Sequence, residues 1–382
     1  MKYKKCLIFI CLIICLFSIA NVCASDMNDI IVANEDQSDE AISVENEEII
    51  SVDENIYESG ATEENELSET TGTFTDLANE ITKCGDELNL TRDYIYTDNK
   101  DNNIIYIDKK ITINGNGFCI NGNGHDIFEI RHDEVTLNNI YFLNSSGVGG
   151  TVHMKGSDGV INNCTFNNCR YYPKTENSIG GVVSWDGNNG FISNCYFVNC
   201  VGKCLRYEKN CGGAISCVGA NCSVYNCSFV GCSVESESMA PYVGGAIYWN
   251  GINGSINNCT FNDCFAKSSH PARVYAYIGG SIFWNQTGGN IKNCYFKNSI
   301  VQTNFISYNG DNGYLDSCVF YDSYFSYIGW YGDNGTIVNS KFINQNNYSS
   351  INWVGSNGNL FNCSFMNCSG SVKNSHGLAI IL

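Results

Sequence analysis

Residues 161–169 read I-N-N-C-T-F-N-N-C, and this stretch decides the fold. Its isoleucine, third-position asparagine, phenylalanine and two cysteines all recur at the same spacing at 192–200 and 256–264, and its eighth-position asparagine recurs as Asn199 and is replaced by Asp263. Variants of the motif occur at 137–145, 224–232, 291–299, 315–323, 337–345 and 360–368. Such repetition is typical of a solenoid, in which each repeat forms one structural unit and stacks on its neighbours.

A second column of large side chains lies twelve residues before the phenylalanine of each repeat, with no insertion in that interval. It contains all five tryptophans and consists of Met154, Trp185, Cys217, Trp249, Trp284, Tyr308, Trp330 and Trp353. Apolar and variable residues alternate around both columns, which is the period of a β-strand. Asn-Gly pairs such as Asn253-Gly254 separate the strands, because both residue types tolerate turn conformations. We therefore expect the phenylalanines and tryptophans to lie in a core.

These features predict an all-β fold, a right-handed single-stranded parallel β-helix of about ten coils. The shortest period, 22 to 24 residues, is too short for a propeller blade of about 40 residues. Leucine-rich repeat spacing is absent. Equivalent residues would then stack about 4.8 Å apart. The motif asparagines would form a hydrogen-bonded ladder at one turn, made of Asn163, Asn194, Asn226, Asn258, Asn293, Asn339 and Asn362.

The chain divides into four segments. Residues 1–25 combine three lysines, an apolar run and a small-residue cleavage site, which is typical of a secretory signal peptide. Residues 26–72 hold sixteen acids and no Lys or Arg, so we expect an acidic disordered tether. Residues 73–132 are expected to form an N-terminal cap, with a short capping helix, and the first coils. Residues 133–382 are expected to form the β-helix repeats.

The formal net charge of −18 excludes a nucleic-acid-binding protein, because such a protein needs a positive surface to displace phosphate counterions. No apolar stretch beyond the signal is long enough to span a bilayer. The sequence thus predicts a secreted or cell-surface protein with no nucleic acid partner and no transmembrane span after signal removal.

Several strings carry a family resemblance. They are I-T-I-N-G-N-G-F-C-I-N-G-N-G at 111–124, V-T-L-N-N-I-Y-F-L-N at 135–144, and G-G-A-I-Y-W-N-G at 244–251 followed by I-N-N-C-T-F at 256–261. Over residues 73–382 the sequence resembles the adhesin-like surface proteins of methanogenic archaea, which have right-handed parallel β-helix repeats. The resemblance implies secretion and a role in surface attachment, and it supplies no catalytic residue.

The chain has 22 cysteines, most of them in the motif columns. Because Ile140 and Ser340 occupy the same column as the first motif cysteine, we interpret it as a packing position filled by free thiols. The alternatives are systematic disulfides or metal sites, but the C-x4-C spacing lacks histidines and differs from zinc motifs. We expect no metal and no cofactor. Cys204 and Cys211, in an insertion, are the candidate disulfide pair.

Four successive repeats carry insertions at one place, near 170–179, 201–211, 233–243 and 265–278. Stacking would bring these insertions to one edge of the solenoid, where insertions often build a binding surface. Tyrosine with arginine is typical of interfaces. The hypothetical ridge comprises Arg170, Tyr171, Tyr172, Lys174, Lys203, Arg206, Tyr207, Lys209, Tyr242, Lys267, Arg273, Tyr275 and Tyr277. Solvated loops without a function are the alternative interpretation.

From these features we expect a non-catalytic, secreted or cell-surface, adhesin-like protein that binds extracellular glycans or surface proteins of neighbouring cells through this ridge. One alternative is a polysaccharide lyase or hydrolase on a pectin-lyase-like β-helix, and another is a purely structural surface protein. The enzyme is disfavoured because acids in the regular coils are few and lie in turns or on separate strands. We assign no catalytic residue. The apolar last coil is expected to support end-to-end or edge association.

Overall fold

The computed structural model describes residues 71–98, 101, 104–173, 180–205, 210–237, 242–268, 278–299, 304–323, 327–374 and 379–381. The predicted signal peptide and all but the last two residues of the predicted acidic tether lie outside the described residues. Among the described residues, no helix has both the length and the apolar character needed to cross a bilayer.

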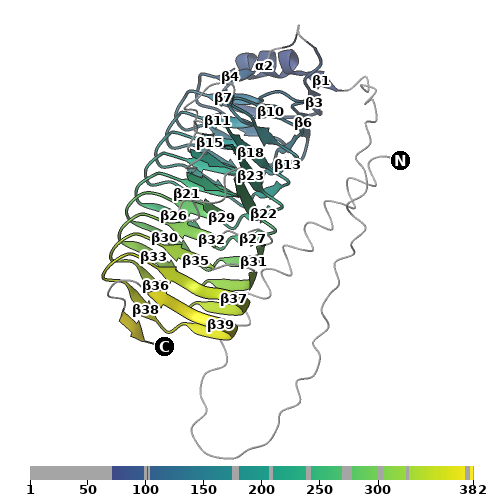
Figure 1. Cartoon of the computed structure of the whole chain (residues 1–382). Helices are drawn as coiled ribbons and strands as arrows, with labels where there is room; N and C mark the ends of the chain where they lie inside the picture. Colours follow the sequence, from purple (N-terminus) through teal and green to yellow (C-terminus); the bar gives the residue numbers. More distant parts are fainter. Residues whose placement is uncertain are drawn as a thin grey trace, which may run out of the picture. The chain divides into compact units, whose positions relative to one another are not determined.

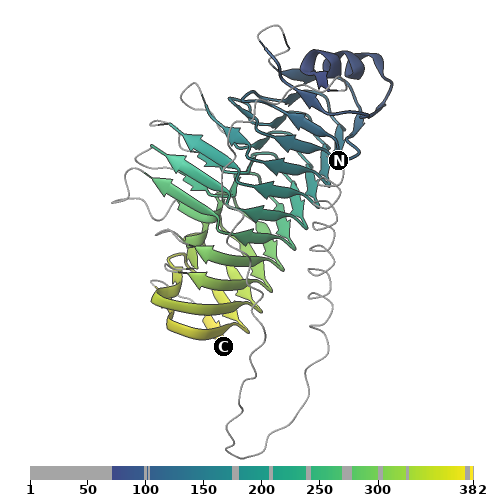
Figure 2. The same ribbon diagram turned by 90° about the vertical axis from the view of Figure 1, so that its right-hand side faces the viewer.

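The chain folds as a right-handed parallel β-helix, as predicted (Figure 1). Each coil contributes three short strands, such as β25 (Ile247–Trp249), β26 (Gly254–Asn257) and β27 (Thr260–Asn262). Each strand pairs in parallel with its equivalent one coil later, so Trp249 pairs with Trp284 and Phe261 with Phe296. Figure 2 shows the strands lying one above another.

The three strands of each coil build three faces, named here after their inward residues. The Trp sheet contains β4 (Ile105–Ile107), β7 (Phe128–Ile130), β11 (Val152–Met154), β15 (Val183–Trp185), β20 (Ile215–Cys217), β25, β29 (Ile278–Trp284), β32 (Asn304–Tyr308) and β35 (Ile328–Trp330). The Ile sheet contains twelve strands of the described chain, slightly more than the ten coils expected. They are β2 (Glu87–Asn89), β5 (Thr112–Asn114), β8 (Thr136–Asn138), β12 (Val160–Asn162), β16 (Phe191–Ser193), β21 (Ser223–Tyr225), β26, β30 (Gly289–Lys292), β33 (Gly313–Asp316), β36 (Thr336–Val338), β38 (Asn359–Phe361) and β40 (Ala379–Ile381).

The Phe sheet forms the third face. It contains β1 (Gly72–Thr73), β3 (Tyr94–Ile95), β6 (Cys119–Asn121), β9 (Tyr141–Leu143), β13 (Thr165–Asn167), β17 (Tyr196–Val198), β22 (Ser228–Val230), β27, β31 (Tyr295–Ser299) and β34 (Val319–Ser323). Two long strands, β37 (Lys341–Trp353) and β39 (Ser364–Asn374), run through both the Phe and the Trp faces. They join the two faces into one 23-stranded sheet.

Stacked aromatic rings fill the core. The rings of Phe166, Phe197 and Phe229 follow one another at 4.8 and 4.9 Å with nearly parallel planes. Trp249 stacks on Trp284 at 4.9 Å, and all five tryptophans are buried. Both predicted core columns are therefore confirmed. Stacking at this distance follows from parallel pairing in register, because equivalent residues repeat at the strand spacing.

Asparagines in the left-handed conformation make the corners. Asn194, Asn226 and Asn258 have φ values of 53–55°, which asparagine tolerates better than most residues. Their side chains form part of the predicted ladder, because Asn226 Nδ2 donates to Asn194 Oδ1 at 2.7 Å and Asn258 Nδ2 donates to Asn226 Oδ1 at 2.9 Å, whereas Asn293 donates to Asn257 and Asn339 to Asp316. Asn194 itself donates instead to Asn162 of the coil before, at 2.8 Å.

The helix α2 (Phe74–Lys83) covers the N-terminal end of the coils, as predicted (Figure 1). Thr73 caps its first turn, and its Oγ1 accepts from the Asp76 backbone N–H at 3.1 Å. The carboxylate of Asp101, which is 7% exposed, accepts from the backbone N–H of Phe74 at 3.0 Å. Phe74 and Leu77 are buried, so the apolar side of the helix protects the first strand edges.

The insertions begin and end as strands, which form what we call the side lobe. Its outgoing strands form a five-stranded parallel sheet of β10 (Ser146–Gly147), β14 (Arg170–Tyr171), β18 (Val201–Cys204), β23 (Ser233–Ser236) and β28 (Phe265–Ser268). Its return strands are β19 (Asn210–Gly212), β24 (Tyr242–Gly244) and the start of β29. A second apolar cluster lies between them, made of Tyr171, Cys204, Cys211, Val234, Val243, Ala266 and Ile278.

Candidate functional site

The outer face of the Trp sheet changes character along the stack. Parallel pairing places Tyr106, Glu129 and His153 in one outward row, which continues to Ser184. The first three coils leave this row open to solvent: Tyr106 is 48% exposed, and Glu129 and His153 are half-buried. From Ser184 the row is buried through Ser216, Tyr248, Phe283 and Ser307.

The side lobe explains this burial. Its Tyr171 ring lies against Gly180 and next to Ser184, since a Cβ built on Gly180 would lie 2.4 Å from the ring and 3.0 Å from the Ser184 hydroxyl. Tyr242 of β24 packs on Phe283 with ring centroids 5.6 Å apart. The open part of the row therefore ends at the first coil that the lobe covers.

Charged side chains gather at this end of the Trp sheet. We call them the charged cluster, which comprises Asp108, Glu129, Arg131, His153, Lys155 and Asp186. A second row follows directly after the strands and consists of Asp108, Arg131, Lys155 and Asp186. Backbone hydrogen bonds at the strand ends hold this row in register from coil to coil. Arg131 N–H donates to Ile107 O, and Lys155 N–H donates to Ile130 O. In later coils this row holds uncharged residues, beginning with Val218 and Asn250.

Glu129 is the central anion of the charged cluster. Its Oε1 accepts from Arg131 Nε at 2.7 Å and lies 2.9 Å from Lys155 Nζ. Arg131 also lies 3.7 Å from Asp108 and stacks over the Tyr106 ring, with its guanidinium carbon 3.9 Å from the centroid. Two cations are thus held side by side on the surface by one shared carboxylate.

The electrostatic balance at Glu129 favours its ionised form. Partial burial raises its pKa, but hydrogen bonds from Lys155 and Arg131 outweigh this effect, so the pKa of Glu129 is lowered. Glu129 therefore carries its negative charge at neutral pH.

A histidine–aspartate pair completes the charged cluster. His153 Nε2 lies 2.8 Å from Asp186 Oδ2, one coil further along the stack. In the neutral ring, an Nε2–H that donates to a carboxylate leaves Nδ1 as the proton acceptor. The His153 side chain is 20% exposed, so part of it reaches solvent.

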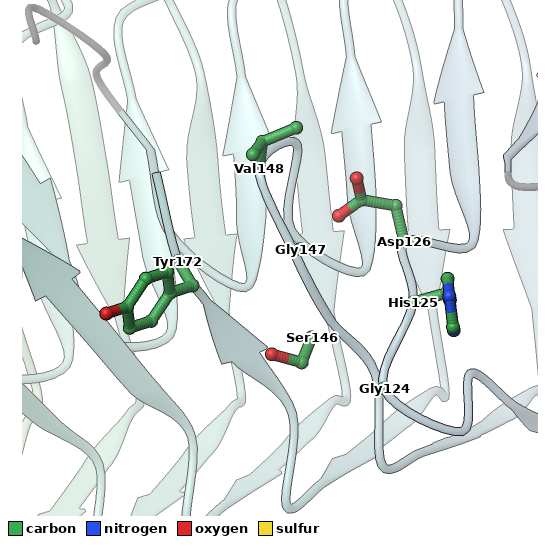
Figure 3. A pocket seen from close by; sticks show the side chains of 7 residues that line it. All are labelled: Gly124, His125, Asp126, Ser146, Gly147, Val148 and Tyr172. Atoms are coloured by element: carbon green, nitrogen blue, oxygen red, sulfur yellow. The ribbon is translucent and has the colours of Figure 1, made fainter. Parts of the chain in front are cut away.

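A pocket of about 460 Å³ lies beside the charged cluster. It is lined by the turn Gly124-His125-Asp126, by Ser146, Gly147 and Val148, and by Tyr172. Figure 3 shows Tyr172 on one side of the Ser146–Val148 segment and Asp126 on the other. A Cβ built on Gly149 would lie 3.8 Å from His153 Cβ and 3.9 Å from the Asp126 carboxyl carbon. Gly149 is therefore close both to His153 and to Asp126, which lines the pocket.

The structure brings together only part of the predicted ridge. Arg170, Tyr172 and Lys267 are exposed, and Lys203 and Tyr242 are half-buried. Tyr171 is 2% exposed and belongs to the second apolar cluster, so it is a packing residue. The other predicted ridge residues, Lys174, Arg206, Tyr207, Lys209, Arg273, Tyr275 and Tyr277, lie outside the described residues.

No disulfide links the cysteines within the described residues. Cys204 and Cys211, the candidate disulfide pair, are both buried thiols in the second apolar cluster. Burial raises the pKa of the Cys169 thiol, which keeps it protonated. The part of the chain that the structure describes contains no group of three or more His, Cys, Asp or Glu side chains arranged to hold a metal ion.

Sequence analysis missed the charged cluster. Its members fall in the strings I-Y-I-D at 105–108, F-E-I-R at 128–131 and V-H-M-K at 152–155. The first two strings precede the aligned repeats, so the register of Ile107 and Ile130 with Trp185 was not apparent, although Met154 was already placed in the tryptophan column. Extending that column back from Met154 to Ile130 and Ile107 would have placed the charged side chains next to one another.

No protein-family model matches the sequence, and a search of characterised proteins finds no match by sequence. Several solved structures are similar in fold. One is described as "a new PL6 alginate lyase complex with trisaccharide", with a TM-score of 0.47, 11% identity and coverage of 82% of this chain and 86% of that chain. Another is alginate lyase AlyF-OU02 with G6, with a TM-score of 0.38, 10% identity and coverage of 81% and 88%.

A third similar structure is ORF18 of Geobacillus virus E2, with a TM-score of 0.37 and 13% identity. The match covers 82% of this chain but 62% of the viral chain, which is less than two thirds of its length. At such identities these likenesses show the fold alone.

These findings correct two expectations. The comparisons do not bear out the non-catalytic, adhesin-like interpretation or the prediction that the chain is not an enzyme, since two of the three similar structures are described as alginate lyases. The β-helix part of the family resemblance is confirmed, whereas nothing in the comparisons supports an archaeal adhesin-like origin.

Proposed function

We propose that the protein is a polysaccharide lyase that cleaves a uronate-containing glycan by β-elimination at the charged cluster. The observation that carries this proposal is the His153–Asp186 pair, 2.8 Å apart, on the same face of the Trp sheet as Arg131 and Lys155. A lyase needs a base for the proton next to a carboxylate and cations for the charge that develops there. The cluster contains both kinds of group.

In the proposed reaction, His153 Nδ1 removes the proton from C5 of a uronate unit. The electrons of that C–H bond form a C4=C5 double bond as the C4–O bond breaks. Arg131 and Lys155 balance the negative charge that spreads onto the uronate carboxylate, and electrostatic stabilisation of this kind is often the largest contribution to catalysis. The leaving oxygen takes a proton from Lys155 or from water.

The state of Glu129 favours a lyase over a hydrolase. A glycoside hydrolase needs one carboxylic acid that is protonated before the reaction, with a raised pKa, beside a second carboxylate. Glu129 has a lowered pKa because of Lys155 and Arg131, and it therefore remains a carboxylate. Its role in the proposed site is to hold these two cations in position.

Polymers of uronic acids are extracellular, so a secreted or cell-surface location fits the proposed substrate. The apolar, lysine-flanked residues 1–25 support export of the chain. The glycan partner proposed here is a polymer of uronic acids, such as alginate, on which two of the similar structures are described as acting.

The test is a substrate survey with the purified full chain. Alginate, polygalacturonate and a neutral β-glucan are incubated separately, and unsaturated ends are followed by the ultraviolet absorbance of the conjugated double bond. We expect product from at least one polyuronate and none from the neutral glucan. A folded protein that releases no unsaturated ends from either polyuronate would contradict the proposal.

A further inference from the structure

We propose that the pocket between the turn 124–126 and Tyr172 binds an uncharged sugar unit, which stacks on the Tyr172 ring and donates hydrogen bonds from its hydroxyls to the Asp126 carboxylate. The pocket is lined by none of the groups that would perform the proposed elimination, and ligand binding in it requires no turnover. The inference therefore goes beyond the proposed function and is tested separately from it.

Pairing between two successive coils forms one wall of the pocket. Gly147 of β10 pairs with Tyr171 of β14, and the Tyr172 N–H donates to the Gly147 carbonyl at 2.8 Å. Because side chains alternate along a strand, Tyr171 is buried in the side lobe whereas Tyr172 is 48% exposed. The pocket volume of about 460 Å³ lies within the range of about 300–1,000 Å³ that is usual for small-ligand sites. An exposed aromatic ring thus borders a hollow large enough for a sugar unit.

Contacts within the protein hold the turn 124–126 in place on the other side of the pocket. Asp126 Oδ1 accepts from the Gly149 backbone N–H at 3.2 Å. Position 147 requires glycine, because a Cβ there would lie 2.0 Å from the same Asp126 oxygen. The His125 ring stacks on Tyr96, with centroids 3.6 Å apart. A site that is formed in advance loses less conformational entropy when it binds a ligand.

The charges at the pocket disfavour a charged ligand of either sign. Among the described residues, those that line the pocket include the Asp126 carboxylate but no Lys or Arg. A ligand carboxylate would therefore meet a like charge with no lining cation beside it. Lys203 lies outside the lining, and its Nζ is 5.0 Å from the Tyr172 ring centroid and 3.1 Å from Glu237. Its charge is thus balanced by Glu237, yet it would repel a cation placed on the Tyr172 ring.

The lining combines apolar faces with oxygen acceptors, which is the pattern that a neutral sugar needs. Tyr172 and Val148 are 48% and 43% exposed and offer apolar surface to the C–H groups of a sugar ring. A carboxylate offers about four acceptor sites, and the Gly149 N–H occupies one of those of Asp126. The Ser146 hydroxyl, which also lines the pocket, both donates and accepts. Figure 3 shows Tyr172 and Asp126 on opposite sides of the β10 segment, so one ligand lying across that segment would contact both.

The test is titration calorimetry of the full chain with neutral tetrasaccharides of cellulose, mannan and galactan. We expect at least one of them to bind. Tyr172→Ala and Asp126→Asn should each weaken that binding about tenfold, which corresponds to about 1.4 kcal/mol. Asp126→Asn retains an oxygen that accepts from the Gly149 N–H, so it removes the charge that strengthens hydrogen bonds from the sugar while the turn keeps its backbone contact.

The chain offers a matched control pair on another face. Tyr314 and Asp316 both lie on β33 of the Ile sheet, where Tyr314 Oη donates to Asp316 Oδ2 at 3.4 Å. Tyr314→Ala and Asp316→Asn make the same chemical changes away from the pocket and should leave binding unchanged. The proposal is wrong if the Tyr172 and Asp126 variants bind the neutral tetrasaccharides as tightly as these controls, or if the unsubstituted chain binds none of the three.

An acidic probe tests the charge of the ligand and separates this proposal from the proposed function. A galacturonate tetramer whose binding is weakened by Tyr172→Ala and strengthened by Asp126→Asn would show that the pocket takes an acidic unit, and would overturn the proposal. Neutral binding that depends on Tyr172, without unsaturated product from any polyuronate, would support the pocket and contradict the lyase. Unsaturated product without any Tyr172-dependent binding of the neutral tetrasaccharides would support the lyase and overturn the pocket.

Discussion

The outer face of the Trp sheet differs between its first three coils and the coils that follow, although the backbone register is the same. In the first region Tyr106 is exposed, and Glu129 and His153 are half-buried. Ser216 and Phe283, in the same row, are buried in the second. The side lobe causes the difference, because its strands begin at β10 and cover the sheet from the next coil onward.

This comparison shows how a regular solenoid acquires a local site. Parallel stacking repeats the backbone every coil, so position alone cannot distinguish one coil from another. Here the outward row changes from His153 to Ser184, and the row that follows the strands changes one coil later, from Asp186 to Val218. In these two rows, charged side chains that reach solvent therefore lie only at the N-terminal end of the Trp sheet. A pocket lies there against the edge of the side lobe.

The comparison predicts the largest difference in catalytic rate between substitutions at two outward positions, His153 and Ser216. His153→Gln should reduce the rate of unsaturated-product formation by about 10²- to 10⁴-fold, the usual contribution of a general base. Ser216→Ala should leave the rate unchanged, because its buried hydroxyl faces the side lobe and has no hydrogen-bond partner among the described residues. Equal losses in both variants would indicate damage to the fold rather than to a site.

A second prediction concerns stability, for which the covered region should be the more sensitive of the two. Phe283→Ala should lower the free energy of unfolding by about 3 kcal/mol, because it leaves a cavity between Tyr242 and Tyr248. Tyr106→Ala, in the open part of the same row, should cost about 1 kcal/mol or less through loss of its contact with Arg131. Urea unfolding of both variants measures the difference. A larger loss from Tyr106→Ala would mean that the first coils are packed and not open.

A third prediction tests the partner of the histidine. Asp186→Asn should lower kcat by about tenfold and leave KM unchanged, because an amide can hold the His153 ring but supplies no negative charge beside it. The effect should be smaller than that of His153→Gln because Asp186 is 47% exposed and water can replace part of its role. A change in KM without a change in kcat would place Asp186 in substrate binding instead.

The smallest effect concerns the pH dependence contributed by Glu129. Its pKa is lowered in the folded protein, so its pairs with Lys155 and Arg131 contribute stability above the unfolded pKa, near 4.5, and that contribution is lost as the pH falls through the folded pKa. Glu129→Gln should cost about 0.5–1 kcal/mol at pH 7, and the difference from the unsubstituted protein should vanish at acidic pH. A difference that grows on acidification would contradict this assignment.

Much of the fold was predictable because the repeat is strict. The constant interval between the tryptophan and phenylalanine columns fixed the register, and Trp249 and Phe261 lie where that interval requires. The corner asparagines were recognisable because few other residues accept a positive φ. Free motif cysteines followed from a column that also holds Ile140 and Ser340, and Cys164 is a buried free thiol.

The candidate site was not predictable in the same way. The coils of Tyr106 and Glu129 lack the tryptophan and the motif cysteines, so these two residues were not placed in register with His153 and the later strands. The insertions were interpreted as loops, but stacking allows their ends to pair as strands, which buries Tyr171 and covers Phe283. Burial of an outward residue depends on contacts between segments distant in sequence, and a strand pattern does not reveal such contacts.

The most direct test of the central claim is to identify the bond that the protein breaks and forms. Proton NMR of alginate and polygalacturonate incubated with the full chain distinguishes the two chemistries, because elimination creates a vinylic proton at C4 of the new non-reducing end. The proposed site predicts this vinylic signal with the unsubstituted protein and its loss with His153→Gln. Saturated ends alone, or a vinylic signal that survives His153→Gln, would contradict it.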